Sequence, residues 1–217
     1  MRFKGVVKMD SMTFPEQKFS NAVDYVDAYF QQIRKAAASV NKEKIENAAR
    51  ILDKAYSNGD FVYSCGNGGS AAIANHLVCD HCKLVRTDTD LTPRVVSLST
   101  TVEVITAIGN DLSYDEVFCY QLEAMAQPDD VLITISSSGD SENIVRAAQL
   151  AKDMGLSVIS MTGFSGGRSA NIADVNLHVD ANNYGVIEDV HQSLMHILAQ
   201  YVRQSHMDES VIQQRKF

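Results

Sequence analysis

The sequence of 217 residues contains no run of about 18 apolar residues, the length that a membrane-spanning helix requires. Its first twelve residues also lack the continuous apolar segment of a secretory signal peptide. Only four cysteines are present, and with 45% hydrophobic residues a chain of this size builds a core without disulfide bridges. These absences predict a protein of a reducing compartment, the cytoplasm, that does not associate with membranes.

Basic residues are few, with 19 Lys and Arg against 27 Asp and Glu, a formal net charge of −8. General nucleic-acid binding depends on Lys and Arg against phosphate, so this balance predicts no nucleic-acid partner. A small anionic substrate is still compatible with it, because backbone N–H groups at a helix start can hold a phosphate.

Proline is also scarce, and the three present (Pro15, Pro93 and Pro128) do not mark a linker. No repeat or low-complexity segment is evident. The sequence therefore predicts one domain over residues 1–217. Within it we expect a leader over residues 1–14, a helical arm over 15–58, an α/β core over 59–205 and a loose polar tail over 206–217.

The arm carries apolar residues at helical spacing in two segments. The first helix is expected to open at Pro15 and Glu16, and the second to cover residues 42–57 and end at Asn58-Gly59. The two helices either cover one face of the sheet or form an oligomerisation arm. We favour the arm, because two long amphipathic helices ahead of a complete α/β unit have little surface to bury against.

From residue 59 onward, short apolar runs alternate with helical segments. The runs cover residues 61–65, 94–98, 131–136, 157–162 and 175–179. The helices are expected near residues 70–84, 102–108, 115–126, 141–154, 166–172 and 186–204. This alternation predicts an α/β fold, a five-stranded parallel sheet in an αβα sandwich, preceded by two N-terminal helices.

Two loops have the composition of phosphate-binding loops. The first strand runs into a glycine-rich turn, Cys65 to Ser70, and then a helix. The third strand runs into Ser136-Ser137-Ser138-Gly139-Asp140-Ser141 at another helix start. The first loop could be no more than a tight turn. In the second loop, an N-cap would account for one serine but not for all four. Both loops follow the carboxyl ends of strands, where open parallel sheets bind ligands.

Two helices carry residues that suit a metal. His76 and Asp80 are four residues apart and share one helix face, and Glu188 and His196 are eight apart on the final helix. Two imidazoles and two carboxylates are a suitable donor set for a divalent transition metal. By themselves these pairs are only suggestive, because a buried histidine is more often part of the core than a ligand.

The motifs CGNGGS at residues 65–70, SSSGDS at 136–141 and GND at 109–111 resemble those of the SIS-domain sugar-phosphate isomerases, and in particular the phosphoheptose isomerases. The resemblance extends from about residue 15 to residue 204. It implies that Ser136, Ser137, Ser138 and Ser141 hold the substrate phosphate. It also implies that the sugar site is lined by Asn67, Gly68, Gly69, Ser70, Asn110, Asp111 and Glu188.

The same resemblance implies a divalent metal, zinc in most members, held by His76, Asp80, Glu188 and His196. Asp80 stands where the family has Glu, which shortens the side chain by roughly 1.5 Å. Glu188 stands where the family has Gln, which adds a negative charge and could favour Mn²⁺ or Fe²⁺. By the family positions, Asp80 is the catalytic base and His196 the acid.

The function that follows from the resemblance is a metal-dependent ketose–aldose isomerisation of sedoheptulose 7-phosphate to a heptose 7-phosphate through an enediol. The family further implies a homotetramer with active sites between subunits. Two alternatives stay open: an isomerase of another sugar phosphate, or a non-catalytic SIS protein that binds a sugar phosphate or a protein partner. The four liganding side chains favour catalysis.

The remaining histidines and cysteines near these motifs are not assigned to the site. His191 lies five residues before His196, around the helix from it, and is expected to serve packing or a subunit contact. Cys79, His81 and Cys82 cluster near His76, but no second Cys-x-x-Cys pair completes a structural zinc site.

Overall fold

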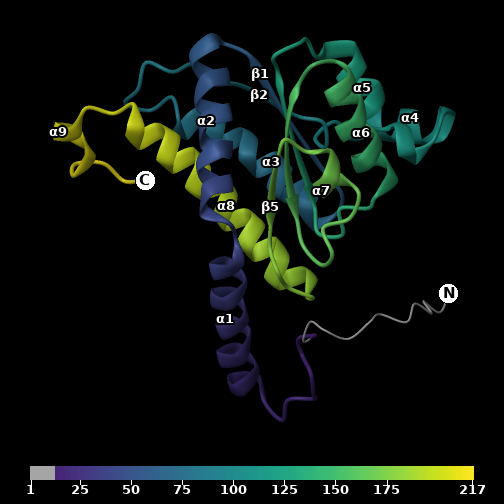
Figure 1. The fold of residues 1–217 in the computed structure, drawn as a ribbon, viewed down its shortest axis with the longest axis vertical. Helices are drawn as coiled ribbons and strands as arrows, with labels where there is room; N and C mark the ends of the chain where they lie inside the picture. The colour runs from purple at the N-terminus through teal and green to yellow at the C-terminus, as the bar shows by residue number, and fades with distance from the viewer. Residues whose placement is uncertain (1–12) are drawn as a thin grey trace.

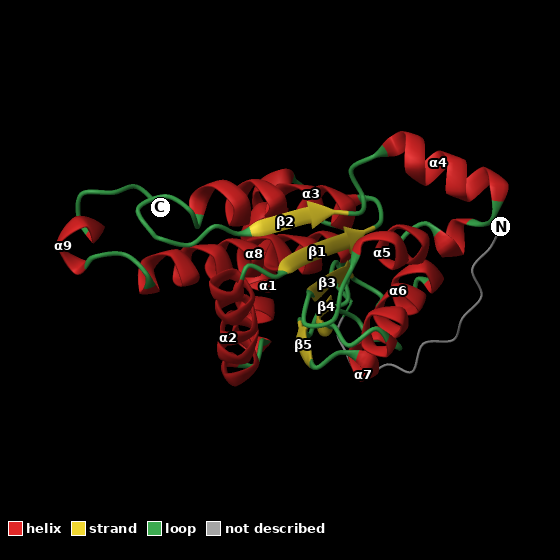
Figure 2. Ribbon diagram, turned by 90° about the horizontal axis from the view of Figure 1, so that it is seen from above, coloured by secondary structure: helices red, strands yellow, loops and turns green. Residues whose placement is uncertain are grey.

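A computed structural model describes residues 13–217, and a five-stranded parallel sheet lies at its centre (Figures 1 and 2). The leader predicted over residues 1–14 falls almost entirely outside the described residues. The strands are β1 (Phe61–Gly66), β2 (Arg94–Ser97), β3 (Val131–Ser136), β4 (Ser157–Thr162) and β5 (Val175–His178). Their order is β2-β1-β3-β4-β5, and every neighbouring pair is parallel. The predicted α/β sandwich is confirmed, with its strands at the predicted places.

Helices cover both faces of the sheet, as a parallel sheet requires. The α-helices are α1 (Ala22–Ser39), α2 (Lys42–Asn58), α3 (Gly69–Cys79), α4 (Val102–Asp111), α5 (Cys119–Met125), α6 (Glu142–Asp153), α7 (Ser169–Ile172), α8 (Tyr184–Ser205) and α9 (Glu209–Ile212). A π-helical turn, η1 (Asp80–Leu84), and a 3₁₀ turn, η2 (Tyr114–Glu116), complete the set. Among residues 13–217 no helix is both long and apolar enough to cross a bilayer.

The core consists of two apolar clusters, one on each face of the sheet. On one face α2, α3 and α8 bury residues such as Leu52, Leu77 and Leu198 against the strands. On the other face α5 and α6 bury Leu122 and Ile144. The strand β3 is buried along its whole length. Because α3 and α8 lie on the same face, residues far apart in the sequence come together between them.

The first helix begins later than predicted. The expected start was Pro15, whereas α1 begins at Ala22 because the side chain of Asn21 accepts a hydrogen bond from the backbone N–H of Asp24 and caps the helix there. In Figure 1, α1 extends from the body of the molecule toward the lower edge of the view. Its inner face contacts α8, where the hydroxyl of Tyr29 donates a hydrogen bond to Asp189 Oδ2 over 2.7 Å.

The helix predicted over residues 70–84 is an α-helix only as far as Cys79, and continues from Asp80 as a π-turn. After α3, the N–H of Val85 donates to the carbonyl of Asp80 over 3.1 Å, the i→i+5 bond of a π-turn. Such turns are rare inside helices and occur often at functional sites. Here the turn begins at Asp80, one of the predicted ligands.

The C-terminal segment is attached to the body, which differs from the loose tail expected over residues 206–217. The buried side chain of Arg203 donates to the carbonyl oxygens of Thr87 and Lys216 and forms a salt bridge of 3.0 Å with Asp88. Arg215 donates to the same Asp88 carboxylate over 2.9 Å. A buried guanidinium needs these acceptors, and their positions fix the tail.

Candidate active site

A pocket opens at the carboxyl ends of β1 and β3, where the two predicted phosphate loops meet. It is lined by Asn67, Ser70, Ile135, Ser136, Ser137, Ser138, Ser141, Tyr184 and Glu188. All four serines of the SSSGDS loop are therefore in the pocket. Both loops also precede helices, α3 and α6, whose first N–H groups are unpaired and carry the positive end of the helix dipole.

Two serines of the second loop have hydroxyl groups that the protein itself leaves unused. The Oγ of Ser137 is buried and has no hydrogen-bond partner. Ser141 is the N-cap of α6, but its side chain makes no capping hydrogen bond. Buried polar groups are normally paired, so a free hydroxyl in a pocket indicates a ligand. The simple N-cap interpretation of these serines does not account for this arrangement.

The shape of the serine loop depends on Gly139, which has a φ of +65°. A Cβ atom at this position would lie 2.0 Å from the carbonyl oxygen of Gly166. Only glycine combines this backbone conformation with so close an approach. The loop from β4 to α7 thus packs against the serine loop.

The glycine-rich loop makes room for a carboxylate. Gly68 has a φ of +56° and caps α3, and a Cβ at Gly69 would lie 2.3 Å from Glu188 Oε2. Glu188, from α8, therefore lies against the first turn of α3, where a negative charge is favourable. Burial and the neighbouring Asp189 raise the pKa of Glu188 above its usual range.

Asn67 is held by a reciprocal amide pair. Its Nδ2 donates to Asn143 Oδ1 over 2.9 Å, and Asn143 Nδ2 donates back to Asn67 Oδ1 over 3.0 Å. The hydroxyl of Tyr114 donates to the same oxygen over 2.8 Å. These bonds fix Asn67 at the edge of the pocket and connect the first loop to α6.

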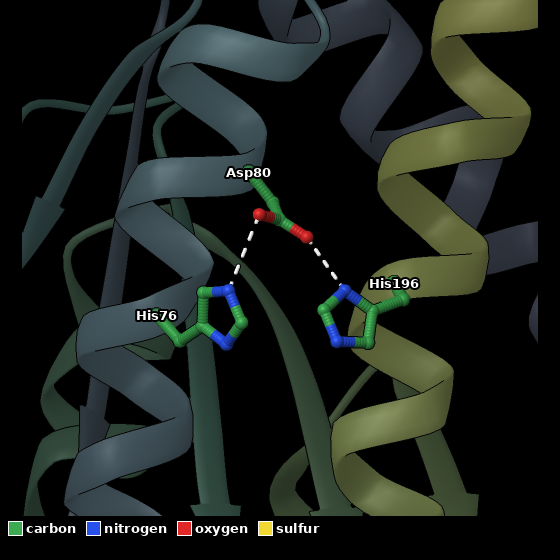
Figure 3. Close-up of side chains that lie close together, drawn as sticks. All are labelled: His76, Asp80 and His196. Atoms are coloured by element: carbon green, nitrogen blue, oxygen red, sulfur yellow. Dashed lines mark hydrogen bonds and ion pairs between the residues drawn. The ribbon is translucent and has the colours of Figure 1, made fainter. Parts of the chain in front are cut away.

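Three predicted residues form a compact cluster between α3 and α8 (Figure 3). The Nδ1–H of His196 donates to Asp80 Oδ2 over 2.6 Å, and His76 Nε2 lies 3.4 Å from Asp80 Oδ1. The two imidazole rings are 5.0 Å apart and nearly perpendicular. Figure 3 shows the carboxylate of Asp80 between the two rings. The tertiary fold thus joins residues 116 positions apart in the sequence.

The donor set of this cluster fits a divalent metal. One ligand atom from each of His76, Asp80 and His196 lies within 4.8 Å of the others. Two imidazole nitrogens and a carboxylate oxygen are common ligands of zinc and related ions. The cluster is partly open to solvent, because 46% of the His76 side chain and 36% of the His196 side chain are exposed.

Glu188 is not part of this cluster, although the resemblance implied it as the fourth ligand. Its carboxylate lies against Gly69 and lines the serine pocket instead. Gly68 and Gly69 shape the loop without lining the pocket, while Ser70 lines it. Asn110 and Asp111 also lie apart: they end α4, are exposed, and bond to each other over 2.8 Å.

Two residues at the site were missed by the sequence analysis. Gln192 Nε2 lies 2.9 Å from His196 Nε2 and 3.1 Å from His76 Nδ1, and Tyr184 lines the pocket at the start of α8. The signal for Gln192 was its position midway between Glu188 and His196, four residues from each, on the same helix face. The predicted start of the last helix at residue 186 left Tyr184 out.

His191, which was expected to serve packing or a subunit contact, is buried in the core, and so is His81. The Nε2–H of His191 donates a hydrogen bond to the Thr162 carbonyl over 3.1 Å, and burial lowers the pKa of His191 to about 4. His81 pairs with the hydroxyl of Tyr56 over 2.5 Å, and burial likewise lowers its pKa to about 4. Neither is a member of the metal-type cluster found among residues 13–217.

Comparison with known proteins gives a consistent family assignment. The model of the SIS domain matches residues 24–163, more than half of the chain. Phosphoheptose isomerase from Aliarcobacter butzleri is 38% identical over 161 residues, which are 74% of this chain and 85% of that protein.

Solved structures agree with this assignment. Phosphoheptose isomerase from Francisella tularensis has a TM-score of 0.78 at 32% identity and covers 85% of this chain and 99% of its own. The enzyme of the same name from Neisseria gonorrhoeae gives the same TM-score, identity and coverage of this chain, over 100% of its own. The chain therefore belongs to the SIS domain family and, within it, to the phosphoheptose isomerases, which are sugar-phosphate isomerases.

Proposed function

We propose that this chain is a metal-dependent isomerase that converts sedoheptulose 7-phosphate into a heptose 7-phosphate through an enediol. The observation that supports it best is the juxtaposition of the two features described above. The serine pocket and the His76–Asp80–His196 cluster lie along one face of α8, with Glu188 in the pocket and His196 in the cluster. The two residues are eight positions apart, or about 12 Å along a helix.

This separation suits the proposed substrate. The phosphate is at one end of a seven-carbon chain and the reacting carbonyl is near the other. In our proposal Ser136, Ser137, Ser138 and Ser141 bind the phosphate through hydroxyl and backbone N–H groups, with no cation needed. The sugar then extends past Glu188 toward the cluster.

The hydrogen bond between His196 and Asp80 supports their assignment as acid and base. In the bond of 2.6 Å the imidazole donates and the carboxylate accepts. We propose that Asp80 removes the proton from the carbon next to the carbonyl, and that His196 gives a proton to the carbonyl oxygen. Asp80 returns the proton to the neighbouring carbon, and His196 recovers one from the other hydroxyl, so that no proton is gained or lost overall.

The proposal includes a divalent metal, with zinc first and Mn²⁺ or Fe²⁺ as alternatives, held by His76, Asp80 and His196. When bound, such a cation polarises a carbonyl and fixes sugar hydroxyls. The side chains of the cluster would then both bind this cation and exchange protons with the substrate.

We also propose that the active protein is a homotetramer in the cytoplasm. The outer face of α1 supports an assembly, because Val23, Val26 and Phe30 are exposed by 71%, 47% and 64%. Exposed apolar residues gathered on one helix commonly mark an interface. Subunit contacts would also give a role to Asn110 and Asp111, which lie outside the pocket of their own chain. A monomer in light scattering would contradict the assembly.

The deciding experiment measures metal content and turnover of sedoheptulose 7-phosphate before chelation, after chelation and after metal is restored. Loss and recovery of turnover are expected. Asp80→Asn and His196→Ala should each lower kcat by about 100-fold or more. His206→Ala is the matched control, since this histidine pairs with Asp53 outside the cluster and should leave turnover unchanged.

The other outcomes separate the alternatives. Bound metal without turnover would indicate an isomerase of a different sugar phosphate. Full turnover in both Asp80→Asn and His196→Ala would refute the assigned roles. Neither metal nor turnover would favour a non-catalytic SIS protein.

A further inference from the structure

The serine loop (residues 136–141) contains one charged residue, Asp140, which is exposed and does not line the pocket. Its Oδ1 accepts two hydrogen bonds from Arg168, one from the backbone N–H over 3.1 Å and one from Nε over 3.0 Å. These bonds lower the pKa of Asp140 below its usual range, so the carboxylate is ionised at neutral pH. The loop therefore carries a negative charge that Arg168 neutralises.

Arg168 also holds the backbone of this loop. Its Nη2 donates to the carbonyl oxygen of Asp140 over 3.0 Å, and its Nη1 forms a salt bridge of 2.9 Å with Glu142 Oε2 in the first turn of α6. Between these two anchored residues stands Ser141, the N-cap whose hydroxyl makes no capping bond. One side chain thus fixes the residues on either side of a serine that lines the pocket.

Backbone hydrogen bonds from the segment after β4 direct further carbonyl groups of the serine loop away from the pocket. The N–H of Gly163 donates to the Ser137 carbonyl over 2.9 Å. The N–H of Ser169 donates to the Gly139 carbonyl over 2.9 Å. A carbonyl oxygen repels a phosphate, whereas successive backbone N–H groups attract one. Because these carbonyls and that of Asp140 are bonded to the neighbouring segment, they are kept from facing an anion in the pocket.

The geometry of Arg168 distinguishes it from an ordinary surface ion pair. A single exposed pair contributes little to stability, because water and salt screen it and its side chains lose entropy. Arg168 instead uses three guanidinium nitrogens and its backbone N–H on acceptors of Asp140 and Glu142. A guanidinium presents its donors in a rigid plane, so it orients the groups that it binds. Its loss should therefore change the conformation of the loop more than the stability of the protein.

We propose that Arg168 is a positioning residue for the substrate phosphate. It holds Asp140 and Glu142 so that the serine loop keeps its binding conformation, and it cancels the negative charge of Asp140 next to that site. Arg168 does not line the pocket, so it acts through the loop. This inference rests on the assignment of the serine loop to the substrate phosphate in the proposed function, and adds to it a residue that precedes α7.

The test compares Arg168→Gln with Arg146→Gln. Arg146 is the matched control, because it is also exposed and also pairs with Glu142, while its other partners, Glu116 and Asp115, lie outside the serine loop. Each substitution removes one positive charge. Calorimetry measures the affinity for inorganic phosphate, and steady-state kinetics with sedoheptulose 7-phosphate give kcat and KM separately.

We expect Arg168→Gln to weaken phosphate affinity and raise KM by about 10-fold, because small misplacements of a binding group have large effects. The kcat should stay within about 3-fold, since phosphate binding is equal in the ground state and the transition state. Arg146→Gln should change phosphate affinity and KM by less than about 2-fold. Thermal unfolding should show similar stability for both variants, which excludes a general loss of folding.

Two further variants separate position from charge. Arg168→Lys keeps the charge without the planar set of donors and should recover only part of the affinity. Asp140→Asn in the Arg168→Gln protein removes the unbalanced charge and should also recover part of it. Normal phosphate affinity in Arg168→Gln, or an equal loss in Arg146→Gln, would overturn the role of Arg168. If the unmodified protein bound phosphate without turning over sedoheptulose 7-phosphate, the proposed function would fail, and the phosphate titrations would still decide the role of Arg168.

Discussion

Nδ1 of His196 donates a hydrogen bond to Asp80 Oδ2 across 2.6 Å, joining α8 to the π-turn η1 that follows α3. This contact fixes the orientation of both groups before any substrate arrives. It also determines which imidazole nitrogen keeps its lone pair. The contact therefore links the fold directly to the proposed metal and proton chemistry.

Metal removal should destabilise the protein, and this effect should depend on His76 as a metal ligand. A ligand that binds only the folded state at a concentration of 100 times its Kd raises the free energy of unfolding by about 2.7 kcal/mol. We expect Zn²⁺ to give a stabilisation of this order in the unmodified protein and much less in His76→Ala. Chemical unfolding with and without chelator measures it. Equal stabilisation of both proteins would place the metal elsewhere.

Ser137→Ala should weaken phosphate binding without loss of stability. The buried hydroxyl has no partner within the protein, so its removal leaves nothing unsatisfied. A lost hydrogen bond to a charged phosphate is worth about 1.5–3 kcal/mol, or roughly 10- to 100-fold in KM. Ser169→Ala is the control, because its hydroxyl is also buried and unpaired but does not line the pocket. A normal KM in Ser137→Ala would remove this serine from the phosphate site.

Gly139→Ala should disrupt the serine loop of residues 136–141. The new Cβ would meet the carbonyl oxygen of Gly166 at 2.0 Å, on a backbone with φ of +65°. We expect a loss of at least about 1–3 kcal/mol of stability together with loss of phosphate affinity. Gly109→Ala, in α4, meets nothing within 4 Å and should be neutral or stabilising by up to about 1 kcal/mol. Thermal unfolding and phosphate titration of both variants test this contrast.

Arg203→Met should release the C-terminal segment. The guanidinium is buried and supplies hydrogen bonds to Thr87 and Lys216 and an ion pair to Asp88. Breaking such a pair from one side costs roughly 3 kcal/mol. Denaturant unfolding should show this loss, and residues 206–217 should become sensitive to proteases. Arg50→Met, which removes an exposed pair with Glu46, should cost less than about 1 kcal/mol. A similar effect of both substitutions would contradict the structural role of Arg203.

The cysteines should differ in reactivity. Burial raises the pKa of Cys65 far above its usual range and that of Cys119 to about 11, so both stay protonated at pH 8. The thiolate is the reactive form, and Cys79 and Cys82 are exposed. Alkylation at pH 8 followed by mass spectrometry should label Cys79 and Cys82 within minutes and leave the other two unmodified. Rapid labelling of Cys65 in the folded protein would contradict its burial.

Much of the fold could be predicted from local patterns. The alternation of apolar runs with helical segments gave five strands at the observed places, because a parallel sheet is buried on both faces. Helix ends were predicted less accurately. Periodicity alone placed the start of the first helix at Pro15, whereas α1 begins at Ala22 because Asn21 caps it. The segment 115–126 contains a 3₁₀ turn before α5 for which the apolar pattern carries no signal.

The sequence by itself determined the serine loop, the glycine-rich loop and the pairing of His76 with Asp80, since each lies within one loop or one helix turn. Only the tertiary structure decided which groups meet across α3 and α8. It joined His196 to Asp80, directed Glu188 toward Gly69 and placed Gln192 between the histidines. The physical reason is that residue spacing along one helix determines which residues share a face. Which of these residues meet those of a second helix depends on the crossing angle and relative shift of the two helices, and these are set by tertiary packing.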